Sequence, residues 1–130
     1  MIGIKNIQPQ PNGNYFVRIK DINMKAVATT DLLVIPASQT IIPVMFSIIN
    51  TGTTGLSSAP DYSLGANGAS YNDYKTIVTL TATATGKFDS PSQSLANIPT
   101  YSNTTLKLNV TTGAVATTFV CDLILEYKVI

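Results

Sequence analysis

The sequence predicts an all-β domain, folded as an antiparallel β-sandwich with no substantial helix. Segments of strand composition recur along the chain and are separated by turns rich in glycine and proline. No segment keeps the i, i+3, i+4, i+7 apolar spacing of a helix over three turns. Threonine, whose β-branched side chain suits a pleated surface, occurs 18 times. The length of 130 residues fits one domain. Its 45% hydrophobic and 12% charged residues are incompatible with a disordered chain.

The chain begins with a segment, residues 1–14, that we interpret as an N-terminal arm or linker. Pro9 and Pro11 cannot donate backbone hydrogen bonds to a sheet, and each forces the preceding residue into an extended conformation. The isoleucines of the same segment also fit an edge strand, so this alternative stays open. Residues 15–130 are expected to form the single sandwich domain.

Three strands are expected in the first half of this domain. Residues 15–22 alternate apolar and polar side chains, whereas residues 24–35 end in a continuous apolar run and residues 41–49 form a second one. Pro43 indicates an edge position or a bulge. A strand that is apolar on both faces is buried on both sides or lies under a neighbouring subunit. We therefore expect the chain to form a homo-oligomer.

Three further strands are expected in the second half. Residues 74–85 and 104–111 alternate, and residues 118–130 alternate most regularly, with apolar side chains on one face and charged ones on the other. This last segment is predicted to be a central strand, paired on both sides to the end of the chain. Residues 50–73 and 86–103 are predicted to be long loops.

The two long loops contain tyrosines that we predict to form a contact surface. Tyrosine gives a large contact area at low entropic cost, and the surrounding serine, glycine and asparagine residues supply adaptable hydrogen bonds. The alternative is that the rings fill the end of the sandwich. The candidate contact residues are Tyr62, Tyr71, Tyr74 and Tyr101.

The sequence offers little for catalysis or for binding a metal or cofactor. It has no histidine, the commonest general base and metal ligand, and Glu126 is its only glutamate. The six aspartates are far apart in the sequence, and no nucleophile, phosphate-binding or calcium-loop motif is present. Cys121 has no partner for an intrachain disulfide and is expected to be a buried hydrophobic residue. We predict a protein that is not an enzyme, with no cofactor and no metal.

The distribution of charged and apolar residues also excludes two classes of partner, nucleic acids and membranes. The net charge is +1 and the basic residues are scattered, so no nucleic-acid surface is predicted. The longest apolar run, residues 41–49, is shorter than the roughly 20 residues of a membrane helix. The first ten residues lack the apolar segment of a secretory signal. We expect a product made in the cytoplasm with no membrane partner.

The order of segments resembles that of small β-sandwich virion proteins of tailed bacteriophages. A threonine-rich lead-in runs into an apolar strand ending in Pro-Ala (residues 28–37), and a second apolar strand follows at 41–49. A loop with glycine and tyrosine (62–74) and a threonine-rich middle come next, and a strand with a tyrosine near its end closes the chain (123–130). The likeness covers about residues 26–130 and rests on layout and composition.

This resemblance implies a jelly-roll-like domain, usually trimeric, that decorates a capsid or forms the head of a fibre. It implies the major capsid protein or other virion proteins as partners, with the N-terminal arm holding them. The chain has no long repetitive stalk, which favours capsid decoration or cement over a receptor-binding fibre. A head domain that binds a host receptor or surface glycan is the alternative.

Overall fold

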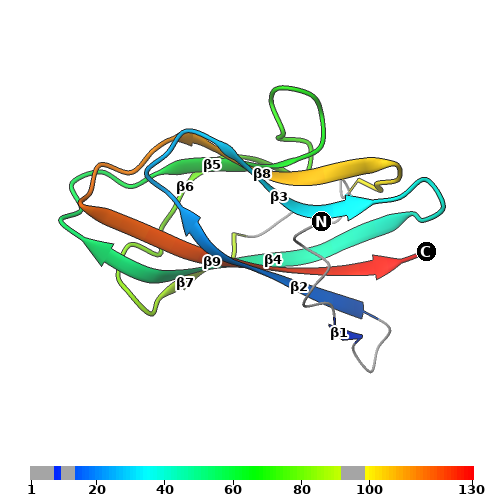
Figure 1. The fold of residues 1–130 in the computed structure, drawn as a ribbon, viewed down its shortest axis with the longest axis horizontal. Helices are drawn as coiled ribbons and strands as arrows, with labels where there is room; N and C mark the ends of the chain where they lie inside the picture. Colours follow the sequence, from blue (N-terminus) through cyan, green and yellow to red (C-terminus); the bar gives the residue numbers. More distant parts are fainter. Residues whose placement is uncertain (1–7, 10–13, 92–98) are drawn as a thin grey trace.

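The computed structural model describes residues 8–9, 14–91 and 99–130, and these form two packed antiparallel sheets (Figure 1). The five-stranded sheet has the order β1-β2-β9-β4-β7 and the four-stranded sheet the order β3-β8-β5-β6. The strands are β1 (Gln8–Pro9), β2 (Asn14–Asn23), β3 (Thr29–Ile35), β4 (Ile41–Thr54), β5 (Asp61–Gly65), β6 (Lys75–Thr79), β7 (Phe88–Asp89), β8 (Thr104–Thr112) and β9 (Thr118–Val129). The described residues contain no helix, so the predicted all-β sandwich is confirmed.

The strand pairing is that of a jelly roll. β2 pairs with β9, β3 with β8, β4 with β7 and β5 with β6, as in one long antiparallel ribbon folded at its middle. The ribbon is rolled so that β9 also pairs with β4 and β8 with β5. Successive strands from β2 to β5 therefore alternate between the sheets. This is the double-sheet arrangement found in viral capsid and lectin domains.

β9 is the centre of the five-stranded sheet, as its regular alternation predicts. It pairs with β2 on one side and β4 on the other, and it continues to Val129, next to the last residue. Its inner face consists of side chains that are at most 4% exposed: Phe119, Cys121, Leu123, Leu125 and Tyr127.

Only part of the apolar surplus predicted for residues 32–35 and 41–49 remains outside the core. The register shifts between Asp31 and Leu33, and both Leu32 and Leu33 are buried. The bulge thus lets adjacent side chains enter one core, and the first run needs no neighbouring subunit. β4 keeps alternate side chains on its outer face, and it has a register shift between Pro43 and Met45, which agrees with the bulge expected at the proline.

Three of the expected segments have wrong boundaries. The supposed loop 50–73 contains the end of β4 and the whole of β5, and the supposed loop 86–103 contains β7. Conversely, the strand expected over 74–85 ends at Thr79. β6 ends early because a side chain binds the segment that follows it. Nδ2 of Asn50, a fully buried residue of β4, donates to the carbonyl of Ala82 at 3.0 Å. A side-chain hydrogen bond here replaces the ladder hydrogen bonds of a continued strand.

The described part of the N-terminal segment adds a short edge strand. Gln8 pairs with Phe16 and Pro9 with Tyr15, while β2 itself begins at Asn14. The rest of the segment predicted as an arm, residues 1–7 and 10–13, lies outside the described residues. None of the described residues belongs to a helix that is long and apolar enough to cross a membrane.

Candidate interaction surfaces

The structure places three of the four candidate tyrosines in the core. Tyr62 is 0% exposed, because it lies on the inner face of β5 opposite Val110 rather than in a loop. Tyr74 and Tyr101 are also buried. This arrangement agrees with the alternative that the rings fill the sandwich, and these three rings have almost no surface with which to contact a ligand.

Two of the buried tyrosines pack against Phe46 of β4. Its ring meets those of Tyr62 and Tyr74 edge to face, with centroids 6.2 and 5.8 Å apart. Tyr101 is attached by backbone hydrogen bonds in both directions with Ile41, of 2.9 and 3.0 Å. Burial is the main cause that raises the pKa of both Tyr62 and Tyr101, with a smaller contribution from nearby aspartates. The hydroxyls of these two residues therefore stay protonated at neutral pH.

Tyr71 is the candidate that stays partly exposed. It belongs to the β5–β6 connector, which is held against the outer side of the four-stranded sheet by a hydrogen bond from Ser63 Oγ to the Tyr71 carbonyl at 2.9 Å. The Lys107 ammonium lies 5.7 Å from the centre of the Tyr71 ring and also forms a 2.9 Å ion pair with Asp31. A cation over an aromatic face is a favourable contact, so the ring is already occupied on one side.

A second surface, with several apolar side chains, lies on the outer side of the five-stranded sheet. We define the outer sheet face by five side chains: Phe16, Met45, Ile49, Phe88 and Ile124. The register brings them together, since Phe16 and Met45 flank Glu126, and Ile49 pairs with Phe88. Phe88 is 69% exposed and Met45 is 44% exposed. The sequence predicts only the β4 part of this surface.

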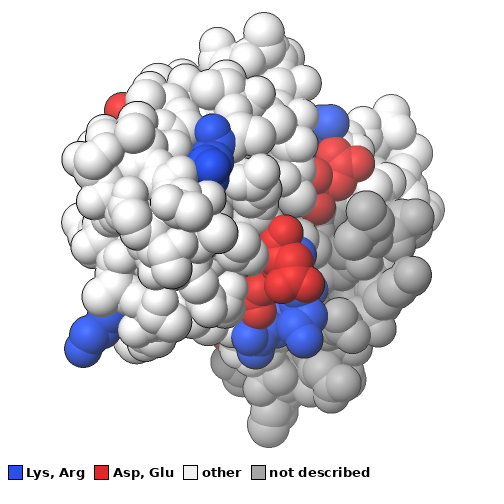
Figure 2. All heavy atoms as spheres, turned by 60° about the vertical axis from the view of Figure 1, so that its left-hand side comes forward, with Lys and Arg blue, Asp and Glu red and all other residues white. Residues whose placement is uncertain are grey.

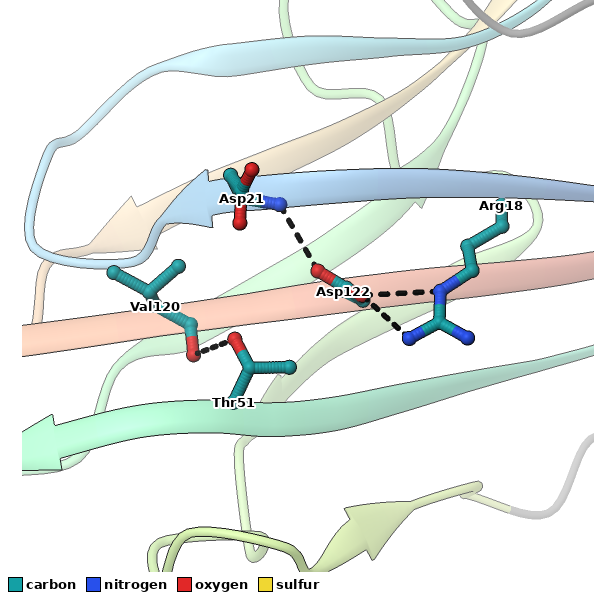
Figure 3. Close-up of polar contacts among 5 residues, drawn as sticks. All are labelled: Arg18, Asp21, Thr51, Val120 and Asp122. Atoms are coloured by element: carbon teal, nitrogen blue, oxygen red, sulfur yellow. Dashed lines mark hydrogen bonds and ion pairs between the residues drawn. The ribbon is translucent and has the colours of Figure 1, made fainter. Parts of the chain in front are cut away.

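An ion pair lies within the outer sheet face (Figure 3). Arg18 donates to Oδ2 of Asp122 from Nε at 3.0 Å and from Nη2 at 2.7 Å. The backbone N–H of Asp21 donates to Oδ1 at 2.9 Å. The Asp122 side chain is only 3% exposed, against 45% for Arg18. Because each Asp122 oxygen is paired, the carboxylate can be buried without a large desolvation penalty.

The described residues contain little that could perform chemistry. None of their histidine, cysteine, aspartate and glutamate side chains gather into a group of three that could hold a metal ion. Burial, together with the neighbouring Asp122, raises the pKa of the Cys121 thiol to about 12. A thiol reacts as the thiolate, so Cys121 is inert at neutral pH.

The comparisons with known proteins identify the fold and no family. No protein-family model and no curated protein matches the sequence. A chain in the acidic stable capsid structure of Helicobacter pylori bacteriophage KHP30 superimposes with a TM-score of 0.60 at 17% identity, covering 90% of each chain. A chain in the capsid asymmetric unit of cyanophage Pam1 gives a TM-score of 0.57 at 12% identity, covering 94% of this chain and 84% of the other. The jelly roll is therefore shared with chains of two bacteriophage capsids.

Proposed function

We propose that this chain is a non-enzymatic structural protein of a bacteriophage virion, of the capsid decoration or cement type. The observation that carries the proposal is the similarity of fold, over nearly the whole chain, to chains of two phage capsids. The chain acts as a homo-oligomer, expected to be a trimer, on a shell built by the major capsid protein. The N-terminal segment contributes to attachment, and its described part, β1, extends the sheet that carries the outer sheet face.

The outer sheet face is the surface proposed to contact the shell. Phe88 is a large aromatic side chain that is mostly exposed, and Met45 is an adaptable apolar neighbour on the same sheet. Aromatic residues dominate the binding energy of many interfaces, and complete burial of one such side chain is worth about 1.5–3 kcal/mol. The Arg18–Asp122 pair gives the surface a fixed polar centre that can set orientation.

Co-sedimentation with capsids prepared without the chain tests this proposal. We expect the purified protein to sediment with such capsids and the Phe88→Asp variant to bind at least tenfold more weakly, a loss of about 1.4 kcal/mol or more. The matched control is Ile77→Asp, which places the same charge on β6 of the other sheet, where Ile77 is 58% exposed. Absence of binding by the unmodified chain, or equal loss in both variants, would contradict the proposal.

The alternative, a head domain that binds a host receptor or glycan, has weaker support. It depends on exposed aromatic side chains, and of the four candidate tyrosines only Tyr71 keeps exposed surface. Binding of the purified chain to a glycan array that is lost on Tyr71→Ala would favour this alternative over capsid decoration.

A further inference from the structure

Three connectors meet at one end of the sandwich, on the left in Figure 1. We define the loop end as residues 24–28, 55–60 and 113–117, which join β2 to β3, β4 to β5 and β8 to β9. Backbone hydrogen bonds fasten them together, from Ala114 N to the Met24 carbonyl at 2.9 Å and from Ser57 N to the Val115 carbonyl at 2.8 Å. The loop end is thus a preorganised surface rather than three independent loops.

Gly113 shows how closely the connectors approach each other. A Cβ atom at this position would collide with the carbonyl group of Lys25 on the neighbouring connector. The Lys25 ammonium in turn donates to the Thr117 carbonyl at 3.0 Å. Little ordering entropy remains to be lost when a partner binds a surface held in this way.

The same pentapeptide, Ala-Val-Ala-Thr-Thr, occurs twice at this end, at residues 26–30 and 114–118. Both copies present their valine to solvent, since Val27 is 70% exposed and Val115 is 58% exposed. The jelly-roll topology brings these two segments, distant in sequence, into neighbouring connectors. The surface therefore has two apolar points of the same chemistry.

The loop end is also almost free of charge. Lys25 is the only charged residue within its three segments. Figure 2 brings this side of the molecule forward and shows a wide, mostly uncharged area with one basic side chain within it and single charged side chains at its edge, while the other acidic and basic residues cluster to one side. Threonine, serine and alanine make up most of the remaining residues.

We propose that the loop end is a self-association surface, and that its partner is a second copy of this chain. In a symmetric contact, residues near the axis meet their own copies, so a charge there would face an identical charge. The loop end has no acidic residue and a single lysine, whose ammonium is bound by the Thr117 carbonyl, so this repulsion stays small. Val27 of one copy can then pack on Val27 or Val115 of another. The loop end is distinct from the outer sheet face, so self-association and attachment to a shell can occur together. The inference does not depend on the virion role.

Sedimentation velocity over a range of protein concentrations tests the inference on the full chain. We expect the unmodified chain to form an oligomer and the double variant Val27→Asp, Val115→Asp to sediment as the 13.8 kDa monomer, with the dissociation constant raised at least tenfold. Ile77→Asp is the control and should leave the oligomer intact, and circular dichroism confirms that each variant is folded.

A charge-rescue arm separates a direct contact from an indirect effect. Mixing the aspartate double variant with Val27→Lys, Val115→Lys should restore association, because opposite charges then meet across the contact. A monomeric unmodified chain, an oligomeric aspartate variant, or a mixture that stays monomeric would each overturn the inference. Loss of the oligomer in Phe88→Asp with retention in the double variant would place self-association on the outer sheet face instead. Capsid co-sedimentation is read separately, so failure there leaves this result unaffected.

Discussion

Replacing Leu123 by alanine tests the central position assigned to β9. Leu123 is 0% exposed and pairs with Ile19 of β2 on one side and Ile48 of β4 on the other. All three side chains lie on the inner face of the five-stranded sheet, which is packed against the other sheet. The site cannot collapse easily, because both flanking strands are fixed by their own pairing.

The expected cost follows from the transfer of the lost side-chain atoms and from the cavity they leave. Leucine-to-alanine changes in cores cost about 2–5 kcal/mol, against a total stability of about 5–15 kcal/mol for a domain. A loss of about 3 kcal/mol should lower the Tm of a chain of this size by about 10–18 °C. The variant should therefore remain folded at room temperature but melt much earlier.

Urea and thermal unfolding followed by far-UV circular dichroism measure this loss, since the chain has no tryptophan for fluorescence. Both proteins must be compared at one concentration, because an oligomer's stability depends on it. Ile77→Ala is the matched control, as Ile77 is 58% exposed on the edge strand β6 and should cost less than about 1 kcal/mol. Equal losses in the two variants would show that β9 is not the centre of the core.

Three other perturbations have defined outcomes. Deleting residues 125–130 removes inner-face residues of β9 and opens an edge on both β2 and β4, so no cooperative melting should remain, whereas deleting residues 1–10 should preserve the fold and weaken only assembly. Asn50→Ala should cost about 1–3 kcal/mol in urea unfolding, because the buried carbonyl of Ala82 loses its donor; a change below about 0.5 kcal/mol would contradict that role. Burial raises the pKa of Cys121 from about 9 to about 12, so the folded chain keeps a proton that the unfolded chain loses. The contribution of Cys121 to the free energy of unfolding should therefore be constant below pH 9 and decrease between pH 9 and 12, so Cys121→Ala should show a shallower decrease over that range than the unmodified chain.

Strands in which apolar side chains recur at every second residue were predictable from the sequence. The alternation of β9 is visible because burial on one face repeats every second residue. Bulges are not visible in this way, and the register shift after Asp31 changed the interpretation of the run 32–35 from surplus surface to core. β5 was missed because it is short and lies in a segment rich in glycine and serine. Its Gly65 is required by the close approach of the backbone at Asp73.

The candidate surfaces were less predictable than the fold because they depend on strand pairing. Phe88 belongs to a strand of two residues, too short to show alternation, and only its pairing with Ile49 places it on the outer sheet face. The repeated pentapeptide can be read in the sequence, but its two copies become neighbours only through the jelly-roll crossover. Tyr62 is a residue type that is common in contact surfaces, yet it lies in the core. Only its pairing with Val110 shows that it belongs to a strand rather than to an exposed loop.

A cryo-electron microscopy reconstruction of the virion that carries this chain tests the proposed role most directly. We expect density for the nine-stranded jelly roll on the outside of the shell, present in several copies in contact at their loop ends. The five-stranded sheet should face the major capsid protein, with Phe88 buried in the contact. A particle without this density, or one in which the chain forms only the tip of a fibre, would contradict the proposal that it decorates the capsid.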